Sequence, residues 1–404
     1  MTSSDPLPSA PALRPARRTT LLRNAGHGAN DLYWFILPPV LPLILQEFGL
    51  RYAAGGGLIT AFLCVTALAS MLMGRLSDSV DRTKLVGLGF LFATAALWAG
   101  ALMPRLPYVI SFIVLGGIGV SAYHPAAYAS IHDSGHGQGR TYGAFEASGS
   151  LANIIMLGAQ GLLVARVGWR GMIAAGALPG ALMGLVFLLV PGAKLGGVPG
   201  KVAARVEPLS GATVPNRGMM LSAVFIIGVM LRGLGVNALY YFIPTYLVRA
   251  VHMDPGIASF AMGFAFLGGV AGAVVMGRAA DRWGHIRTYV LASGLLIPLL
   301  PVMGARMPAA AYPAVMVAIG FASSACFPAQ TMLLTELSGT RGKGSVFGVL
   351  MGATALTAAV SPLLFGLLAD AAGLVTAVIA CVIPVTAGWI VTLIVWKSLR
   401  SRAR

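Results

Sequence analysis

Polar side chains recur at helical spacing in the first apolar run of the chain, residues 22–46. Positions i, i+3, i+4 and i+7 of this run hold His27, Asn30, Asp31 and Trp34. This spacing places the four side chains on one face of a helix and suits the wall of a solute pathway. An ionisable residue within an apolar span is costly and indicates function. Asp31 is therefore the first candidate proton carrier; the alternative is a structural hydrogen-bond partner for another span.

Two further ionisable residues of the first half lie within apolar runs. His124 precedes Pro125, which frees a backbone carbonyl one turn earlier. A neutral imidazole there can donate to a substrate or relay a proton, and the alternative is a satisfied core histidine. Glu146 lies one to two turns into another run, with Arg140 near its inner end. It is interpreted either as a second proton site or as a cytoplasmic gate paired with a basic residue.

Arg232 is the one basic residue placed well within an apolar run. An arginine cannot shed its charge, so it needs a carboxylate partner or an anionic substrate. Asp31 is a natural partner if the two runs face each other across the centre. Asn237 and Tyr241 follow at i, i+4 spacing and suit a substrate wall. Gln330, two residues after a proline, is a further candidate for a position facing the pathway.

The remaining chemistry-bearing groups have structural explanations. The three cysteines, Cys64, Cys326 and Cys381, fall within apolar runs without metal-ligand spacing, and the His-x-x-Asn-Asp run alone is too little for a metal site. No nucleotide-binding loop, catalytic carboxylate pair or nucleophile motif occurs, so neither direct use of ATP nor an enzyme is expected. We expect no metal and no cofactor, with a proton gradient as the energy source. Four acids near the ends of the runs are interpreted as cap or interface residues: Asp133, Asp254, Glu336 and Asp370.

The elements that must position these residues are membrane-spanning helices. Of the 404 residues, 57% are hydrophobic and only 10% are charged, whereas a soluble protein carries about 25% charged residues. Apolar runs of about 20 residues, the length that crosses a bilayer, recur along the whole chain. The twelve predicted spans are 22–46, 55–75, 84–103, 107–131, 139–165, 169–190, 219–247, 257–277, 287–304, 309–335, 343–369 and 374–396.

Charge and composition predict how the chain is divided and oriented. Most of the 28 basic residues fall in the two tails, a central polar stretch and the loops after the second, fourth, eighth and tenth spans. The positive-inside rule then places both termini in the cytoplasm. We expect a multi-pass protein of a bacterial-type plasma (inner) membrane. The predicted segments are a disordered cytoplasmic tail 1–21, a six-helix bundle 22–190, a cytoplasmic linker 191–217, a second six-helix bundle 218–396 and a basic cytoplasmic tail 397–404.

The net charge of +16 does not indicate nucleic-acid binding, because the basic residues are scattered between apolar spans. The expected partners are membrane lipid and a small-molecule substrate. The chain is expected to be a monomer.

An internal repeat relates the two halves. Three pairs of like residues are each 203 positions apart: Gly74 with Gly277, Asp78 with Asp281, and Pro125 with Pro328. A shared offset at separate places indicates parallel repeats, a pseudo-twofold axis along the membrane normal and a central site between the halves. In each loop a glycine lets helix ends approach, and an aspartate can accept from helix amides or pair with arginine. The predicted conformational lock comprises Gly74, Asp78, Arg82, Gly277, Asp281 and Arg282, and the alternative is a solvated turn.

These loops resemble the signature loop of the major facilitator superfamily, G-x-x-x-D-R-x-G-R-x-x. The second copy matches at Gly277, Asp281, Arg282 and Gly284. In the first copy Asp81 replaces the second glycine, and Arg82 and Lys84 supply the basic charge. The resemblance implies an all-α membrane protein of two pseudo-symmetric six-helix bundles that works by alternating access.

A narrower resemblance concerns the first and fourth spans. His27, Asn30 and Asp31, the run Leu-Pro-Pro-Val-Leu-Pro at 37–42, and Tyr123-His124-Pro125 resemble the fosmidomycin-resistance-type exporters. This likeness implies export of a small solute.

The sequence leaves three classes of function to compare. The first is a secondary transporter that exports a small anionic or amphiphilic organic solute with proton coupling. Proton-coupled uptake of an organic acid or anion, with Arg232 holding the anion, is its variant. The second class is a non-transporting membrane sensor, and the third is an intramembrane enzyme. Short tails and the absence of catalytic motifs favour the first class.

Overall fold

The computed structural model describes residues 17–133, 138–192, 194–195, 217–338 and 343–400. Within these residues every element is helical. The elements are α1 Arg17–Trp34, α2 Leu37–Glu47, α3 Tyr52–Ser79, α4 Arg82–Leu102, α5 Leu106–Val120, α6 Tyr123–Asp133, α7 Gln138–Leu189, α8 Arg217–Arg249, α9 Pro255–Trp283, α10 His285–Gly304, the short 3₁₀ helix Ala309–Ala311, α11 Tyr312–Ser338, α12 Lys343–Ala372, α13 Leu374–Ala380 and α14 Val382–Arg400.

These helices supply twelve spans long and apolar enough to cross a membrane, which confirms the predicted number. The helix α7 contains two spans, Ala144–Val164 and Arg166–Leu189. The helix kinks close to their junction, at Gly168, whose φ of 63° lies in the left-handed region that glycine adopts without strain. Much of the polar linker, residues 196–216, lies outside the described residues, as do the outer parts of both predicted tails.

Three spans are broken, where the sequence predicts continuous helices. The first span divides between α1 and α2, the fourth between α5 and α6, and the twelfth between α13 and α14. Each break lies about one turn before a proline: Pro38 and Pro39, Pro125, and Pro384. A proline cannot donate to the carbonyl four residues earlier and its ring crowds that carbonyl. The breaks at the first and fourth spans place irregular backbone close to the ionisable side chains of α1 and α6.

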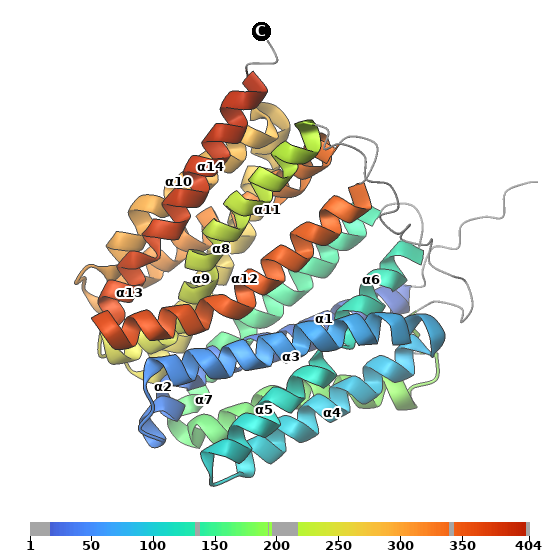
Figure 1. Cartoon of the computed structure of the whole chain (residues 1–404). Coiled ribbons are helices and arrows are strands. Elements are labelled where there is room, and N and C mark those ends of the chain that lie inside the picture. The colour runs from blue at the N-terminus through green and yellow to red at the C-terminus, as the bar shows by residue number, and fades with distance from the viewer. Residues whose placement is uncertain (1–16, 134–137, 193, 196–216, 339–342, 401–404) are drawn as a thin grey trace, which may run out of the picture.

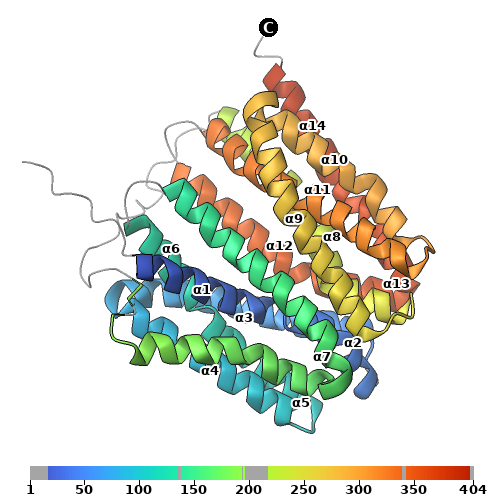
Figure 2. The same cartoon turned by 180° about the vertical axis from the view of Figure 1, so that it is seen from behind.

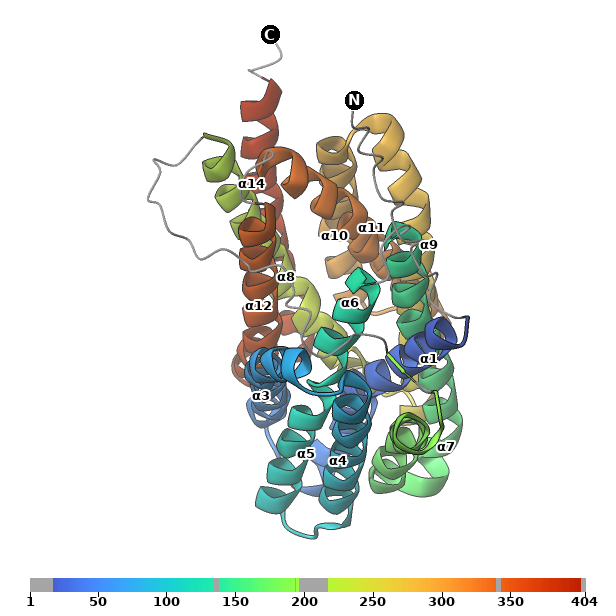
Figure 3. The ribbon, with the colours of Figure 1, turned by 90° about the vertical axis from the view of Figure 1, so that its right-hand side faces the viewer.

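The two halves, α1–α7 and α8–α14, lie side by side and meet along α3 and α12 (Figure 1) and along α7 and α9 (Figure 2). The predicted repeat has a spatial counterpart. A Cβ on Gly74 would lie 3.8 Å from the Cβ of Pro125, and a Cβ on Gly277 would lie 3.8 Å from the Cβ of Pro328. The same contact, between α3 and α6 and between α9 and α11, therefore recurs in both halves. Figure 3 shows the two halves from the side.

The contact between α3 and α12 is close and capped. A side chain on Gly56 would overlap the carbonyl of Pro362. Asp370, near the end of α12, accepts hydrogen bonds from the backbone N–H groups of Tyr52 at 2.8 Å and Ala53 at 3.0 Å. Its carboxylate therefore caps the N-terminus of a helix from the other half. The prediction that Asp370 is a cap or interface residue is confirmed.

We expect Asp370→Ala to loosen this contact, because two N-terminal amides of α3 lose their acceptor. The loss of such bonds costs on the order of 1–3 kcal/mol, measurable as a lower midpoint of thermal unfolding in detergent. Asp254→Ala is the matched control, because Asp254 caps α9 of its own half through Gly256 and Ile257. Only the Asp370 variant should speed labelling of a cysteine introduced at Gly57. Equal labelling in both variants would contradict the role of Asp370 between the halves.

Candidate functional site

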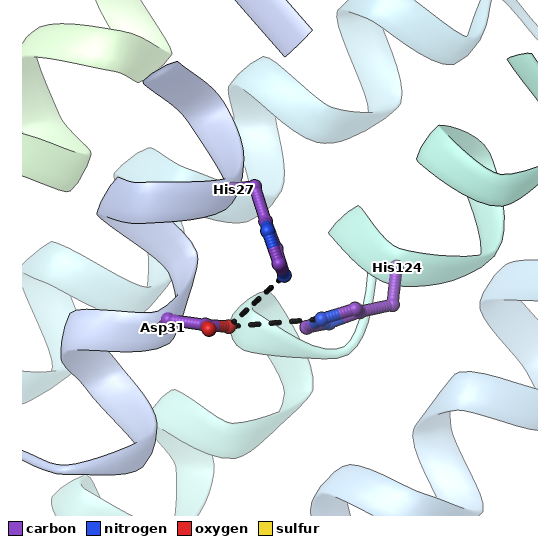
Figure 4. Close-up of side chains that lie close together, drawn as sticks. All are labelled: His27, Asp31 and His124. Atoms are coloured by element: carbon purple, nitrogen blue, oxygen red, sulfur yellow. Dashed lines mark ion pairs between the residues drawn. The ribbon is translucent and has the colours of Figure 1, made fainter. Parts of the chain in front are cut away.

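Three ionisable side chains from two helices meet in the N-terminal half (Figure 4). His27 and Asp31 lie one turn apart on α1, and His124 comes from the first turn of α6. The His27 Nε2 atom lies 3.4 Å from Asp31 Oδ1, and the His124 Nε2 atom lies 3.7 Å from the same oxygen. The three nearest ligand atoms are all within 4.8 Å of one another, an arrangement that could hold a metal ion. The sequence predicts the first pair, and the fold adds His124.

The orientation of His27 follows from a backbone contact. Its Nδ1 lies 2.6 Å from the carbonyl oxygen of Phe145. Because a carbonyl only accepts, this nitrogen carries the hydrogen. The Nε2 atom of a neutral His27 therefore directs a lone pair toward Asp31. The ring of Phe145 stacks on the imidazole with centroids 3.7 Å apart and holds it in this plane.

His124 is oriented by the polar stripe of α1. The Asn30 side-chain nitrogen lies 3.1 Å from His124 Nδ1. The Asn30 oxygen is buried and has no hydrogen-bond partner among the described residues. Trp34, one turn further along the stripe, packs edge-on against His124 with ring centroids 6.2 Å apart. All four residues of the predicted stripe are thus brought to one place.

The cluster is sheltered but reachable. The side chain of His27 is 3% exposed, whereas Asp31 is 21% and His124 is 25% exposed. An ion or proton can therefore reach Asp31 and His124, while His27 forms the closed side. Glu146 of α7 accepts a hydrogen bond of 3.2 Å from Tyr128 and lies close enough to interact electrostatically with Asp31. The side chain of Arg140, its predicted gating partner, lies outside the described residues.

Arg232 occupies the other half. Arg232 is 5% exposed. Its Nη2 atom donates to the side-chain oxygen of Gln330 at 3.4 Å. The guanidinium also faces the rings of Tyr289 and Phe327, each 5.9 Å from centroid to Cζ. The expected pairing with Asp31 is wrong: Asp31 pairs with the two histidines of its own half, and Arg232 forms no ion pair within the described part of the chain. Asp31 lies on α1 of one bundle and Arg232 on α8 of the other, and each bonds within its own bundle.

The two other candidates on α8 lie apart from Arg232. Tyr241 is buried and stacks on Phe35 at the break of the first span, with centroids 6.1 Å apart. Asn237 is partly buried. Their assignment to a substrate wall stays a prediction, and Tyr241 places that wall at the contact between the halves.

The predicted lock residues lie at helix ends and not in loops. Gly74 and Asp78 lie near the end of α3, Arg82 begins α4, and Gly277, Asp281 and Arg282 lie near the end of α9. Asp78 forms an ion pair with Arg82 at 3.8 Å, and Arg82 also donates to the carbonyl of Ser77. The helix-capping role belongs to Asp81, which accepts from the amides of Thr83 and Lys84. In the second copy of the motif, at the end of α9, Asp281 and Arg282 are exposed and form no ion pair with any described residue. The interpretation as a lock therefore stays a prediction.

We expect Asp78→Asn to slow turnover roughly two- to fivefold, the range for losing an exposed ion pair of this kind. Substrate affinity should change little, because the ion-pair partner of Asp78 is Arg82 and not a residue of the cluster. Initial rates at several solute concentrations in proteoliposomes separate the two effects. Asp81→Asn is the matched control, since asparagine caps a helix as well as aspartate does. A defect confined to affinity would count against the lock.

Three residues complete the cluster without being predicted: Tyr128, Phe145 and Gly149. Tyr128 stands four residues after His124, so helical spacing could have indicated it. Phe145 acts through its carbonyl and ring, and neither leaves a sequence signal. A side chain on Gly149 would overlap the Asp31 carboxylate, so only glycine lets α7 pass this close to α1.

Two helical bundles with ionisable groups in their interiors define a membrane transporter. The chain belongs to the major facilitator superfamily, whose model matches residues 25–303 and 225–404. It is a multi-pass membrane protein, and the relatives described next are transporters.

The curated relatives are transporters of low identity. The sphingosine-1-phosphate transporter SPNS2 of Mus musculus is 26% identical over 65% of this chain and 51% of its own length. The uncharacterized MFS-type transporter YceJ of Bacillus subtilis is 23% identical over 65% of the chain and 66% of its own. The probable L-galactonate transporter of Escherichia coli is 25% identical over 59% of the chain and 55% of its own. The chain thus spans about half to two thirds of these relatives.

Solved structures resemble the fold closely. A bacterial homologue of the human lysosomal transporter Spinster, inward-facing and unoccupied, gives a TM-score of 0.77 at 16% identity, over 96% of this chain and 98% of its own. A D-xylose–proton symporter gives 0.72 at 16% identity, over 94% and 97%. At such identities the likeness concerns the fold alone, which agrees with the predicted two-bundle architecture.

Proposed function

We propose that this protein moves a small organic anion, including amphiphilic anions, across a plasma membrane by alternating access. Export driven by the proton gradient is the leading form of the proposal. The observation that carries it is the buried guanidinium of Arg232, which forms no ion pair with a described residue.

The positive charge of Arg232 favours an anionic solute. A guanidinium stays charged at any physiological pH, and an uncompensated charge inside a membrane protein is costly. The bond to Gln330 and the faces of Tyr289 and Phe327 offer only neutral partners. An anionic group of the solute would supply the missing charge and a two-pronged hydrogen bond. Two relatives are named for solutes of this kind, a phosphate ester and a sugar-acid anion.

The proposed energy source rests on the opposite half. Asp31 and Glu146 are carboxyl groups within spans, and Asp31 contacts two imidazoles. Groups of this type take up and release protons in transport proteins. Placing the acids in one bundle and the arginine in the other lets relative movement of the bundles couple proton movement to solute movement.

Export and uptake differ in the direction in which the solute crosses the membrane. The likeness of the first and fourth spans to fosmidomycin-resistance-type exporters favours export. The name of the galactonate relative gives an organic acid as its solute but no direction, so uptake of an organic acid is the alternative. A thermal-shift screen of the purified protein against organic acids, with their neutral amides as controls, would first identify a solute. Transport would then be measured in inverted vesicles under an imposed pH gradient.

The expected result is stabilisation by acids but not by amides, and accumulation inside inverted vesicles whose interior is acidic. Equal stabilisation by acid and amide would exclude the anionic solute. Transport that follows the solute gradient and ignores pH would exclude proton coupling, and accumulation only in right-side-out vesicles would establish uptake.

A further inference from the structure

The cluster of His27, Asp31 and His124 has the chemistry and the spacing of a transition-metal site. We propose that these three side chains bind a single divalent ion of the Zn²⁺ type. A bound ion would also block the transport cycle by occupying the Asp31 carboxylate, and that consequence rests on the proposed function.

The ligand atoms lie close to coordinating distance. A tetrahedral Zn²⁺ ion lies about 2.0–2.1 Å from imidazole nitrogen and carboxylate oxygen, which puts neighbouring ligand atoms about 3.3 Å apart. The His27–Asp31 pair is already at 3.4 Å and the His124–Asp31 pair is at 3.7 Å. Figure 4 shows the three side chains converging on one point from two helices. All three ligand atoms lie within 4.8 Å of one another, so the two imidazoles would move toward each other to complete a three-ligand site.

His27 is supported on its outer nitrogen, as metal-bound histidines generally are, and His124 can gain such support by a turn of the neighbouring Asn30 amide. The His27 Nδ1 atom donates to the carbonyl of Phe145 at 2.6 Å, leaving Nε2 free for an ion. For His124 the neighbour is the Asn30 amide at 3.1 Å. A half-turn of the Asn30 side-chain amide exchanges the positions of its oxygen and nitrogen. Turning it lets Asn30 Oδ1, buried and otherwise without a described partner, accept from His124 Nδ1.

Charge and access agree with this assignment. Two imidazoles and one carboxylate are the ligands that Zn²⁺ and its neighbours prefer, whereas Ca²⁺ and Mg²⁺ prefer oxygen alone. A second carboxyl group, that of Glu146, lies on α7, the helix that carries Phe145. The partial exposure of Asp31 and His124 provides an entry side for an ion, and water commonly supplies the fourth ligand of such three-ligand sites.

Binding is tested on the full-length protein, purified in detergent and freed of metal. Titration with Zn²⁺ by calorimetry, and visible absorption of bound Co²⁺ as a report of ligand type, measure the site without any solute. We expect Asp31→Asn and His124→Gln each to remove one bound equivalent of Zn²⁺. Asn30→Ala should weaken the affinity of the protein for Zn²⁺ roughly 10- to 100-fold.

His285→Ala is the matched control, because His285 also pairs with a carboxylate, Glu336 at 2.5 Å, but in the other half. It should leave that equivalent of Zn²⁺ bound. Gel filtration and thermal unfolding verify that each variant is folded, and His27→Gln provides a second ligand variant if one fails.

Two results would overturn the site: a wild-type protein that binds no Zn²⁺, or Zn²⁺ bound equally by wild type and Asp31→Asn. Transport assays distinguish the consequence from the site. Zn²⁺ that binds but leaves transport unchanged would refute the blocking role while the site stands. Absence of Zn²⁺ binding would leave the proposed organic-anion transport intact.

Discussion

Replacing Arg232 with alanine is expected to weaken solute binding severely and to impair transport. A hydrogen bond to a charged group contributes about 1.5–3 kcal/mol, so affinity for an organic acid should fall roughly 10- to 150-fold or more. Arg232→Lys should recover part of the affinity, because lysine keeps the charge but loses the planar fork that grips a carboxylate or phosphate. Calorimetric titration with the acid identified by thermal shift measures both variants.

Arg306→Ala serves as the control for this series, because Arg306 is exposed in a loop. Its affinity for the acid should equal that of the wild type. An Arg232→Ala protein that is folded and still binds the acid with wild-type affinity would show that Arg232 is structural. The solute's anionic group would then need another partner.

Asp31→Asn is expected to abolish accumulation driven by a pH gradient while leaving exchange of labelled solute across the membrane. Asparagine has nearly the shape of a protonated aspartic acid, and its side-chain N–H can donate to the His27 lone pair at the same position. The variant therefore imitates the protonated cluster and cannot release a proton. Accumulation and exchange are compared in the same proteoliposomes, with and without the gradient.

Asp254→Asn is the matched control, since asparagine retains the helix cap of α9 and this residue lies in the other half. Its accumulation should respond to the gradient as in the wild type. Gradient-driven accumulation that persists in Asp31→Asn would exclude Asp31 as the carrier and direct attention to Glu146.

Much of the architecture could be predicted because lipid imposes simple rules. Apolar runs of span length determine the number of helices, since no other backbone arrangement of such runs satisfies its hydrogen bonds in hydrocarbon. The equal offsets of Gly74 and Gly277 and of Pro125 and Pro328 predict the repeat, and the fold confirms it by packing each glycine against its proline. The breaks in the first, fourth and twelfth spans were signalled only indirectly, by prolines that helices sometimes tolerate.

For the site, the sequence determined less and the tertiary structure determined more. Helical spacing by itself determined that His27, Asn30, Asp31 and Trp34 share one face, because that relation depends only on the period of the helix. Tertiary structure alone decided that His124 joins them, that the Phe145 carbonyl sets the His27 hydrogen, and that Arg232 bonds Gln330 rather than Asp31. These contacts join residues about a hundred positions apart, and such pairings depend on how helices rotate and approach as they pack, which no local period encodes.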